Sequence, residues 1–268
     1  MAKVNEEKRA DDFCEQISTE IWREKASPDN AYLVDEVRCH GYDHLALINH
    51  KSLSEVIYLL MQGELPNDGQ KILFERLLIS LINPGPRHNA TRAVMNAAVS
   101  RTHISHLLPI GLTVLGGENQ GSHDVFKAMK YLQRSQAKCP AETAAGLSDH
   151  CAPEAGDQHL VPGFGSLYGT QDCYSKKLLA NLESTGHTGQ YVAWANQFVT
   201  ALVQPHCGWL ISGVAAAVLL DLGFSPHQGE LVYQLARLPG LAAHGAEKFA
   251  KPITDMPFIA EDNYVIDN

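Results

Sequence analysis

The polar residues around a first glycine-rich turn, residues 116–122, are of the types that acid–base chemistry requires. Asn119 can donate a hydrogen bond to an oxyanion, and His123 can exchange a proton near neutral pH. An apolar-periodic segment follows, so we expect His123 and Asp124 to lie in the first turn of a helix, where backbone N–H groups favour anions. Two interpretations stay open: an acid–base site, or a helix start in which Ser122 is the N-cap and Asp124 interacts with the helix dipole.

A second group of candidate residues consists of Arg87, His88 and Arg92, which follow a Pro- and Gly-rich stretch at residues 83–86. All three cluster at the expected N-terminal end of one helix. Guanidinium groups bind carboxylates in a bidentate manner. The cluster therefore predicts a binding site for an acidic ligand, and the alternative is a solvated helix start.

The helices that must position these residues are predicted from apolar residues at helical spacing along most of the chain. The start and stop signals are clear in places, for example the capping box of Ser52 and Glu55 before an apolar run that ends at Gly63. We find no long alternating strand pattern and no strand before either glycine-rich turn. The predicted helices cover about residues 11–24, 52–63, 67–82, 89–100, 104–115, 188–203, 209–222 and 228–249, with others starting at 122 and 172.

The remaining segments are predicted to be irregular. Residues 135–160 show no sustained period and are interpreted as a surface connection, and the tail after Lys251 is expected to be extended. A second glycine-rich loop covers residues 161–169. The βαβ rhythm of a nucleotide-binding sheet is missing. A mostly helical protein with glycine-rich turns is therefore predicted, which by itself names no function.

The composition argues against several classes of function. The chain has 268 residues, enough for one large domain or a domain with a smaller lobe. A formal net charge of −9 argues against nucleic-acid binding, which needs a basic surface. The 13 histidines show no HExxH-like spacing, so no metal site is expected. The six cysteines form no CxxC pair, and neither a signal region nor a membrane span is apparent, so we expect a cytoplasmic protein without a membrane partner.

Several segments, taken in order, resemble the citrate synthase family, in particular its short citryl-CoA lyase-like members. The resemblance covers about residues 38–265. Its motifs are Gly41-Tyr42-Asp43, the segment 54–60, Gly63-Glu64-Leu65-Pro66, Leu115-Gly116-Gly117, Val161-Pro162-Gly163-Phe164-Gly165, Asp221-Leu222-Gly223-Phe224 and Leu235-Ala236-Arg237-Leu238-Pro239-Gly240.

The resemblance implies an all-α, citrate synthase-like fold with a large helical domain and a smaller helical lobe. Residues 1–40 would form an N-terminal arm, residues 41–164 and 251–268 the large domain, and residues 165–250 the small lobe. It also implies a homodimer, because the family's active site draws on both subunits. The expected ligands are an acyl-CoA and a small carboxylic acid, with the coenzyme A thioester as a substrate and no separate cofactor.

The family's catalytic groups do not carry over to this chain. Its first catalytic His falls on Asn119, its second on Ser166, and its catalytic Asp on Ser212. Of its residues for the second substrate, only Arg237 clearly matches. The resemblance therefore implies a non-standard active site, in which the catalytic candidates are Asn119, Ser166, Ser212 and a displaced His123.

Two further sets of residues are interpreted through the resemblance. The family uses the loop of Pro162, Gly163, Phe164 and Gly165 to hold the adenine of coenzyme A; the alternative is a tight turn kept for packing. Hydroxyl residues at or near the family's acid–base positions, Ser166, Tyr168, Tyr174 and Ser212, predict a polar pocket with Tyr168 as a candidate proton donor. For Ser212 the alternative is a small residue kept for helix packing.

Two classes of function remain. The first is an enzyme that forms or cleaves a carbon–carbon bond next to an acyl-CoA thioester. The second is an inactive homologue that binds acyl-CoA or a carboxylate, or pairs with an active paralogue.

Overall fold

The computed structural model describes residues 13–147 and 159–266. The chain divides into two compact units whose boundary lies between Leu65 and Pro66. Helices make up most of the described secondary structure and the strands are short, which confirms the predicted all-α class. The division into an arm, a large domain and a small lobe stays a prediction.

The first unit combines a three-stranded antiparallel sheet with two helices. The strands are β1 (Trp22–Ala26), β2 (Val34–Cys39) and β3 (Tyr42–Asp43), and the helices are α1 (His44–His50) and α2 (Leu53–Gln62). A small core of Cys39, Leu47 and Leu59 lies between them.

The helix predicted over residues 11–24 is wrong for its described part. Residues 13–21 are not helical, and a strand begins at Trp22 and pairs with the segment ending at Cys39. Ile17, Thr19 and Ile21 are β-branched residues that favour extended backbone. Pairing with a partner strand here outweighs the local amphipathic pattern.

The helix α2 confirms the prediction from its capping signals. The Ser52 side chain accepts from the Glu55 backbone N–H, and the Glu55 side chain accepts from the Ser52 backbone N–H. Gly63 ends the helix with a φ of 82°, in the left-handed region where glycine is favoured.

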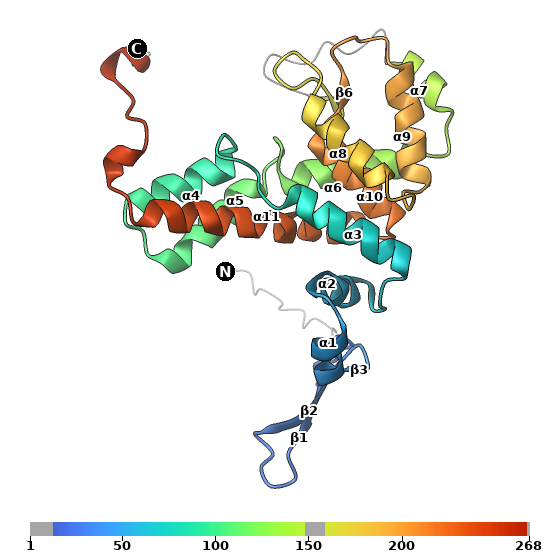
Figure 1. Cartoon of the computed structure of the whole chain (residues 1–268), viewed down its shortest axis with the longest axis vertical. Helices are drawn as coiled ribbons and strands as arrows, with labels where there is room; N and C mark the ends of the chain where they lie inside the picture. The colour runs from blue at the N-terminus through green and yellow to red at the C-terminus, as the bar shows by residue number, and fades with distance from the viewer. Residues whose placement is uncertain (1–12, 148–158, 267–268) are drawn as a thin grey trace, which may run out of the picture. The chain divides into compact units, whose positions relative to one another are not determined.

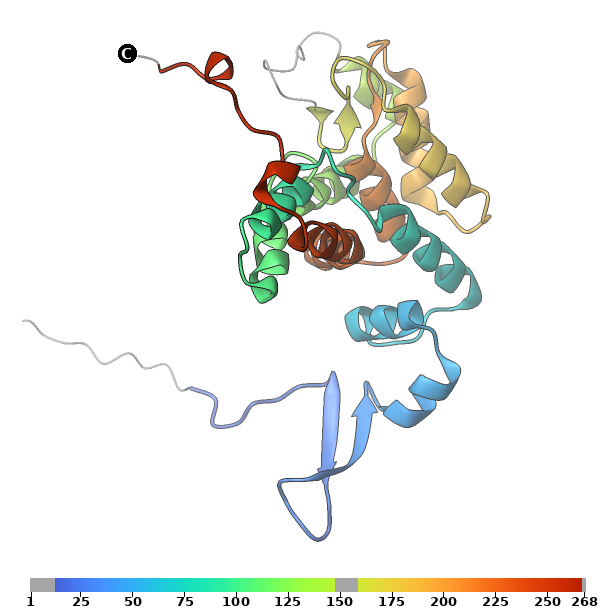
Figure 2. The ribbon, with the colours of Figure 1, turned by 60° about the vertical axis from the view of Figure 1, so that its left-hand side comes forward.

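The second unit contains the long helix α11 and the helices that surround it. The helices are α3 (Asp68–Leu81), α4 (Asn89–Val99), α5 (Leu107–Leu115), α6 (Ser122–Ser135), α7 (Pro140–Ala145), α8 (Cys173–Glu183), α9 (Gln190–Ala201), α10 (Ile211–Asp221) and α11 (Pro226–Phe249). In Figure 1, α4 and α5 run beside α11, and Figure 2 views α11 nearly end-on with α3 on its other side. The helix α6 contacts both α11 and α10.

The segment interpreted as a surface connection without a sustained period, residues 135–160, contains the short helix α7. Pro140 occupies its first turn, where the missing N–H is not needed. Six residues are too few to show an apolar period, which explains why this helix was missed. Part of the predicted connection lies outside the described residues.

The second glycine-rich loop, residues 161–169, is predicted without strands, but part of it belongs to a small sheet. The sheet contains β4 (His159–Val161), β5 (Phe164–Gly165) and β6 (Gly208–Trp209), in that order and antiparallel. Strands of two or three residues are too short for an alternating pattern, and β6 is distant in sequence. The Pro162-Gly163 turn is thus a hairpin turn.

The tail is irregular apart from two short 3-10 turns, η2 (Ile253–Asp255) and η3 (Glu261–Asn263). No described helix is long and apolar enough to cross a membrane. Within the described residues, no three His, Cys, Asp or Glu side chains are grouped so that they could hold a metal ion.

Candidate functional site

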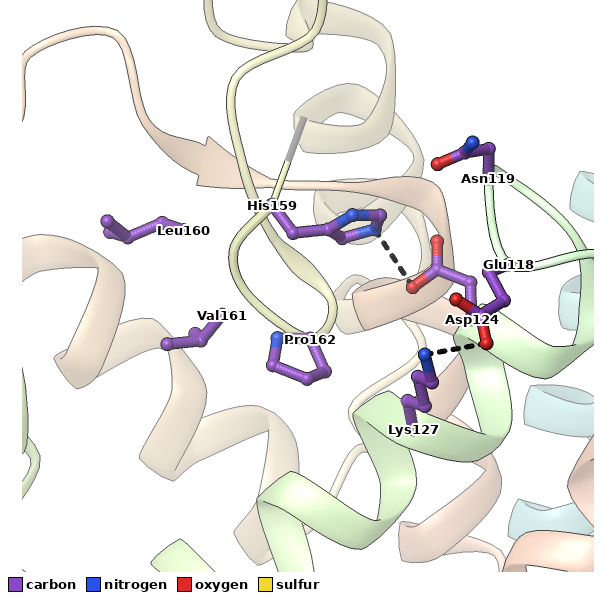
Figure 3. A pocket seen from close by; sticks show the side chains of 8 residues that line it. All are labelled: Glu118, Asn119, Asp124, Lys127, His159, Leu160, Val161 and Pro162. Carbon is purple, nitrogen blue, oxygen red and sulfur yellow. Dashed lines mark ion pairs between the residues drawn. The ribbon is translucent and has the colours of Figure 1, made fainter. Parts of the chain in front are cut away.

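The first glycine-rich turn and the β4–β5 hairpin line a common pocket of about 480 Å³ (Figure 3). Its lining residues are Glu118, Asn119, Asp124, Lys127, His159, Leu160, Val161 and Pro162. Two of the predicted site residues, Asn119 and Pro162, are therefore brought together. The other lining side chains include four charged or ionisable groups.

Two ion pairs organise the polar side of this pocket. His159 Nε2 lies 3.0 Å from Asp124 Oδ1, and Lys127 Nζ lies 2.9 Å from Glu118 Oε1 (Figure 3). The Lys127 ammonium holds the pKa of the Glu118 carboxyl below its usual range. The two pairs differ in burial, because Asp124 is 3% exposed whereas Glu118 lies on the surface.

Local structure explains how His159 reaches Asp124. Asp124 lies in the first turn of α6, next to the positive end of the helix dipole. His159 begins β4 and pairs with Gly165 of β5. The hairpin therefore places the imidazole against the start of α6, 35 positions earlier in the chain.

The hairpin turn is held close against α10 by two glycines. Gly163 has a φ of +85°, and a Cβ built on it would lie 2.8 Å from the Gly213 Cα. A Cβ on Gly213 would in turn lie 2.1 Å from the Gly163 carbonyl oxygen. That oxygen accepts a hydrogen bond of 3.1 Å from the Leu210 N–H. A side chain at either glycine would force the hairpin away from α10.

The Phe164 side chain fixes the other side of the hairpin. It is fully buried, with its ring centroid 5.1 Å from that of Phe198 and 5.0 Å from that of Trp209. This ring therefore belongs to the core. Gly165, at the end of the predicted coenzyme A loop, is buried as well.

A buried hydrogen-bond chain links α4 and α11 through the first glycine-rich turn. His88 Nδ1 accepts from the Ala90 N–H at 3.1 Å, so its Nε2 carries the proton that it donates to the Gln120 carbonyl at 3.1 Å. The Tyr233 hydroxyl donates to the same carbonyl at 3.3 Å and accepts from Arg237 Nη2 at 2.7 Å.

Burial changes the acid–base behaviour of this chain. It lowers the pKa of His88, and Arg237 acts in the same direction, whereas the bond to the Gln120 carbonyl opposes the change. Burial raises the pKa of Tyr233, against the effect of the nearby Arg237 guanidinium. The chain therefore joins a neutral imidazole, a neutral phenol and one buried cation.

The predicted cluster of Arg87, His88 and Arg92 is divided by the fold. His88 points inward as the N-cap of α4 and is buried. Arg87 and Arg92 are exposed and line a separate pocket of about 530 Å³ together with Lys248 and residues of the tail.

His123 lies near the first pocket but is not one of its lining residues. Its Nδ1 is 3.4 Å from Glu230 Oε1, and its ring stacks on Phe126 with centroids 5.3 Å apart. The expectation that Ser122 is the N-cap of α6 is wrong: Gly121 occupies that position. The Ser122 hydroxyl accepts from Gln234 Nε2 at 2.9 Å, because α11 packs against this end of α6.

The hydroxyl candidates lie in unlike surroundings. Ser212 is fully buried in the first turn of α10, and its Oγ has no hydrogen-bond partner. Ser166 is half-buried directly after β5. Tyr168 is 82% exposed, with a φ of 51°.

The sequence patterns did not identify His159 as a site residue, and they did not identify Tyr233 as the link between Arg237 and the Gln120 carbonyl. His159 lies in a segment without a period, so no local signal marked it. Tyr233 and Arg237 are four residues apart on α11 and thus share one helix face, a spacing visible in the sequence.

Comparisons with known proteins give matches among solved structures only, since no family model and no curated protein matches the sequence. Citryl-CoA lyase from Hydrogenobacter thermophilus superposes with a TM-score of 0.76 at 20% identity, over 94% of both chains. ATP citrate lyase from Methanothrix soehngenii, in complex with citrate and coenzyme A, gives 0.68 at 15% identity, over 94% of this chain and 43% of that one. Citrate synthase from Thermotoga maritima superposes with a TM-score of 0.58 at 18% identity, over 80% of this chain and 59% of that one. The chain therefore has the helical citrate synthase-like fold.

Proposed function

We propose that this protein binds an acyl-CoA and a small carboxylic acid and forms or cleaves the carbon–carbon bond next to the thioester. The reaction would be of the citryl-CoA lyase or citrate synthase type, with a non-standard set of polar groups. The proposal draws on the shared fold and on the ligands of a structural neighbour, an ATP citrate lyase in complex with citrate and coenzyme A.

The observation that carries the proposal is the buried guanidinium of Arg237. Arg237 is 6% exposed, its Nε has no hydrogen-bond partner, and no described carboxylate forms an ion pair with it. An unpaired buried charge is destabilising by several kcal/mol. A ligand carboxylate would supply the missing acceptor, so we assign the acid partner to Arg237, with Arg87, His88 and Arg92 as further candidates.

We assign coenzyme A to the loop of Pro162, Gly163, Phe164 and Gly165. The buried Phe164 ring and the contact of Gly163 with Gly213 fix the loop backbone, so the half-buried Pro162, at the start of the loop, is the proposed contact with the ligand. Pro162 lines the pocket beside Asn119, whose amide would donate to the thioester oxygen. The remaining catalytic candidates are His123, Ser166 and Ser212.

The second candidate function is an inactive homologue with the same ligands. The Ser212 hydroxyl favours it, because a serine needs an activating base and this Oγ has no hydrogen-bond partner. In that case the protein would bind acyl-CoA or a carboxylate without turnover, or pair with an active paralogue. In both versions we propose a cytoplasmic homodimer.

Isothermal titration calorimetry tests the binding proposal. We expect heat on titrating coenzyme A, and separately on titrating citrate or oxaloacetate. Arg237→Met should weaken binding of the acid at least tenfold, since a hydrogen-bonded charge contributes about 1.5–3 kcal/mol, and should leave coenzyme A binding intact. Arg134→Met, which removes an exposed arginine of α6, is the matched control.

No heat with coenzyme A up to millimolar concentration would exclude both versions. Incubation with acetyl-CoA plus oxaloacetate, and separately with citryl-CoA, distinguishes them. Turnover of either mixture identifies an enzyme, whereas binding without turnover identifies the inactive homologue.

A further inference from the structure

We propose that His159, oriented by Asp124, is the proton-transfer residue of the 480 Å³ pocket. It would move a proton to and from the carbon next to the acyl-CoA thioester. This inference rests on the proposed function and gives it an acid–base group that the sequence motifs do not supply.

The geometry of the pair suits this role. The Asp124 carboxylate is 3% exposed and lies 3.0 Å from His159 Nε2, a contact that orients the ring. The imidazole itself lines the pocket (Figure 3). Both members of the pair therefore line the pocket, and the carboxylate is the more buried of the two.

Asp124 is one of two carboxylates that act on the ring, because Glu118 also interacts electrostatically with His159. Lys127 lies 2.9 Å from Glu118 and offsets part of its charge. Asn119 contributes an uncharged amide on the same side of the pocket (Figure 3). A proton acceptor and a donor for an oxyanion therefore face one cavity, as enolate formation requires.

The chemical step is a reversible proton transfer. Neutral His159 takes a proton from the α-carbon, the C–H electron pair becomes the enolate, and the ring becomes imidazolium beside the Asp124 carboxylate. The enolate oxygen accepts a hydrogen bond from Asn119. Return of a proton from the ring to carbon restores the thioester, so no oxidant or further reactant is needed.

The sequence-based candidate for this task, His123, fits it less well. It does not line the pocket, and its Nδ1 faces Glu230 on α11 at 3.4 Å, with its ring stacked on Phe126. This pairing directs His123 toward α11, whereas His159 is directed into the pocket by the hairpin.

Hydrogen–deuterium exchange of the acetyl methyl group tests the proposal. The full-length protein is incubated with acetyl-CoA in D2O, alone and with oxaloacetate, and deuterium uptake into the methyl group is followed by NMR. We expect His159→Gln to lower the exchange rate at least 100-fold, as for loss of a general base. His206→Gln, which changes an exposed histidine beside β6, should exchange at the wild-type rate.

Further variants separate proton transfer from a structural role. In Asp124→Asn the exchange rate should fall at least tenfold, and the midpoint of its pH profile should move to lower pH because the carboxylate is lost. In His159→Ala, added imidazole should restore part of the exchange. Each variant is also titrated with coenzyme A, and all should bind it.

Each outcome bears on a defined claim. An unchanged exchange rate in His159→Gln would overturn the proposal. The proposal would also fail if the pH midpoint of exchange stayed the same in Asp124→Asn and imidazole restored no exchange in His159→Ala. Wild-type protein that binds acetyl-CoA without exchange would overturn it too, while the binding function would stand. Absence of coenzyme A binding would mean that the proposed function itself has failed.

Discussion

At the scale of single residues, the interior of the second unit holds a histidine whose protonation opposes folding. His88 uses both ring nitrogens, one as an acceptor for the Ala90 N–H and one as a donor to the Gln120 carbonyl. A second proton would remove the acceptor and place a cation near Arg237. Burial therefore lowers the pKa of His88 below 6.5, its value in an unfolded chain.

This depressed pKa predicts a loss of stability on acidification. Below about pH 6.5 the unfolded chain binds a proton that folded His88 does not, so the free energy of unfolding falls by up to about 1.4 kcal/mol per pH unit. The fall continues until the pH reaches the folded pKa. Urea unfolding at pH 7, 6 and 5 measures it.

His88→Gln should be less stable at pH 7 but should lose less stability between pH 7 and 5 than the wild type. His206→Gln, at an exposed histidine, is the control and should keep the wild-type slope. If the free energy of unfolding fell equally with pH in the wild type and in His88→Gln, the assignment of a neutral, buried His88 would be contradicted.

At the scale of elements, Asp221 joins two helices. It is the last residue of α10, and its carboxylate accepts three backbone N–H groups at the start of α9. These are the N–H groups of Gly189 at 2.7 Å, Tyr191 at 2.8 Å and Val192 at 3.2 Å. A Cβ on Gly189 would lie 2.7 Å from Asp221 Oδ1, which explains a glycine at this N-cap.

We expect Asp221→Ala to lower the free energy of unfolding by about 2 kcal/mol, because it removes the cap of α9 and leaves three donors unsatisfied. Denaturant unfolding followed by circular dichroism measures the change. Asp262→Ala, which removes an exposed acid of η3, should stay within about 0.5 kcal/mol of the wild type. Equal effects of the two variants would show that the cap contributes little.

At the scale of the whole molecule, burial is distributed unevenly among the described elements. Every residue of α10 from Ser212 to Leu220 is buried, whereas every residue of β1 is exposed. Elements with a large apolar contact area open only with global unfolding, while short exposed hairpins open locally.

Native-state hydrogen exchange should therefore show two levels of protection. Amides of α10 should exchange most slowly, and those of β1 at least 100-fold faster at equal intrinsic rates. Equal protection of both elements would contradict this. If protection of β1 then fell on tenfold dilution of the protein, a second chain covering the hairpin would explain it and would support the proposed homodimer.

The sequence by itself determined most of the helices and the class of fold. Local signals are sufficient there: the capping box of Ser52 and Glu55 fixes the start of α2, and Gly63 fixes its end. The order of the glycine-rich motifs indicated a citrate synthase-like fold, which the structural neighbours share. Local patterns failed at Trp22, where a strand partner decided the conformation.

Only the tertiary structure decided which side chains share a pocket. His159 and Asp124 are 35 positions apart, and their contact depends on a hairpin of two very short strands. The relay from Arg237 through Tyr233 to Gln120 likewise joins segments more than 100 positions apart. Such contacts follow from how helices and turns pack together, and the spacing of residues along the chain does not encode them.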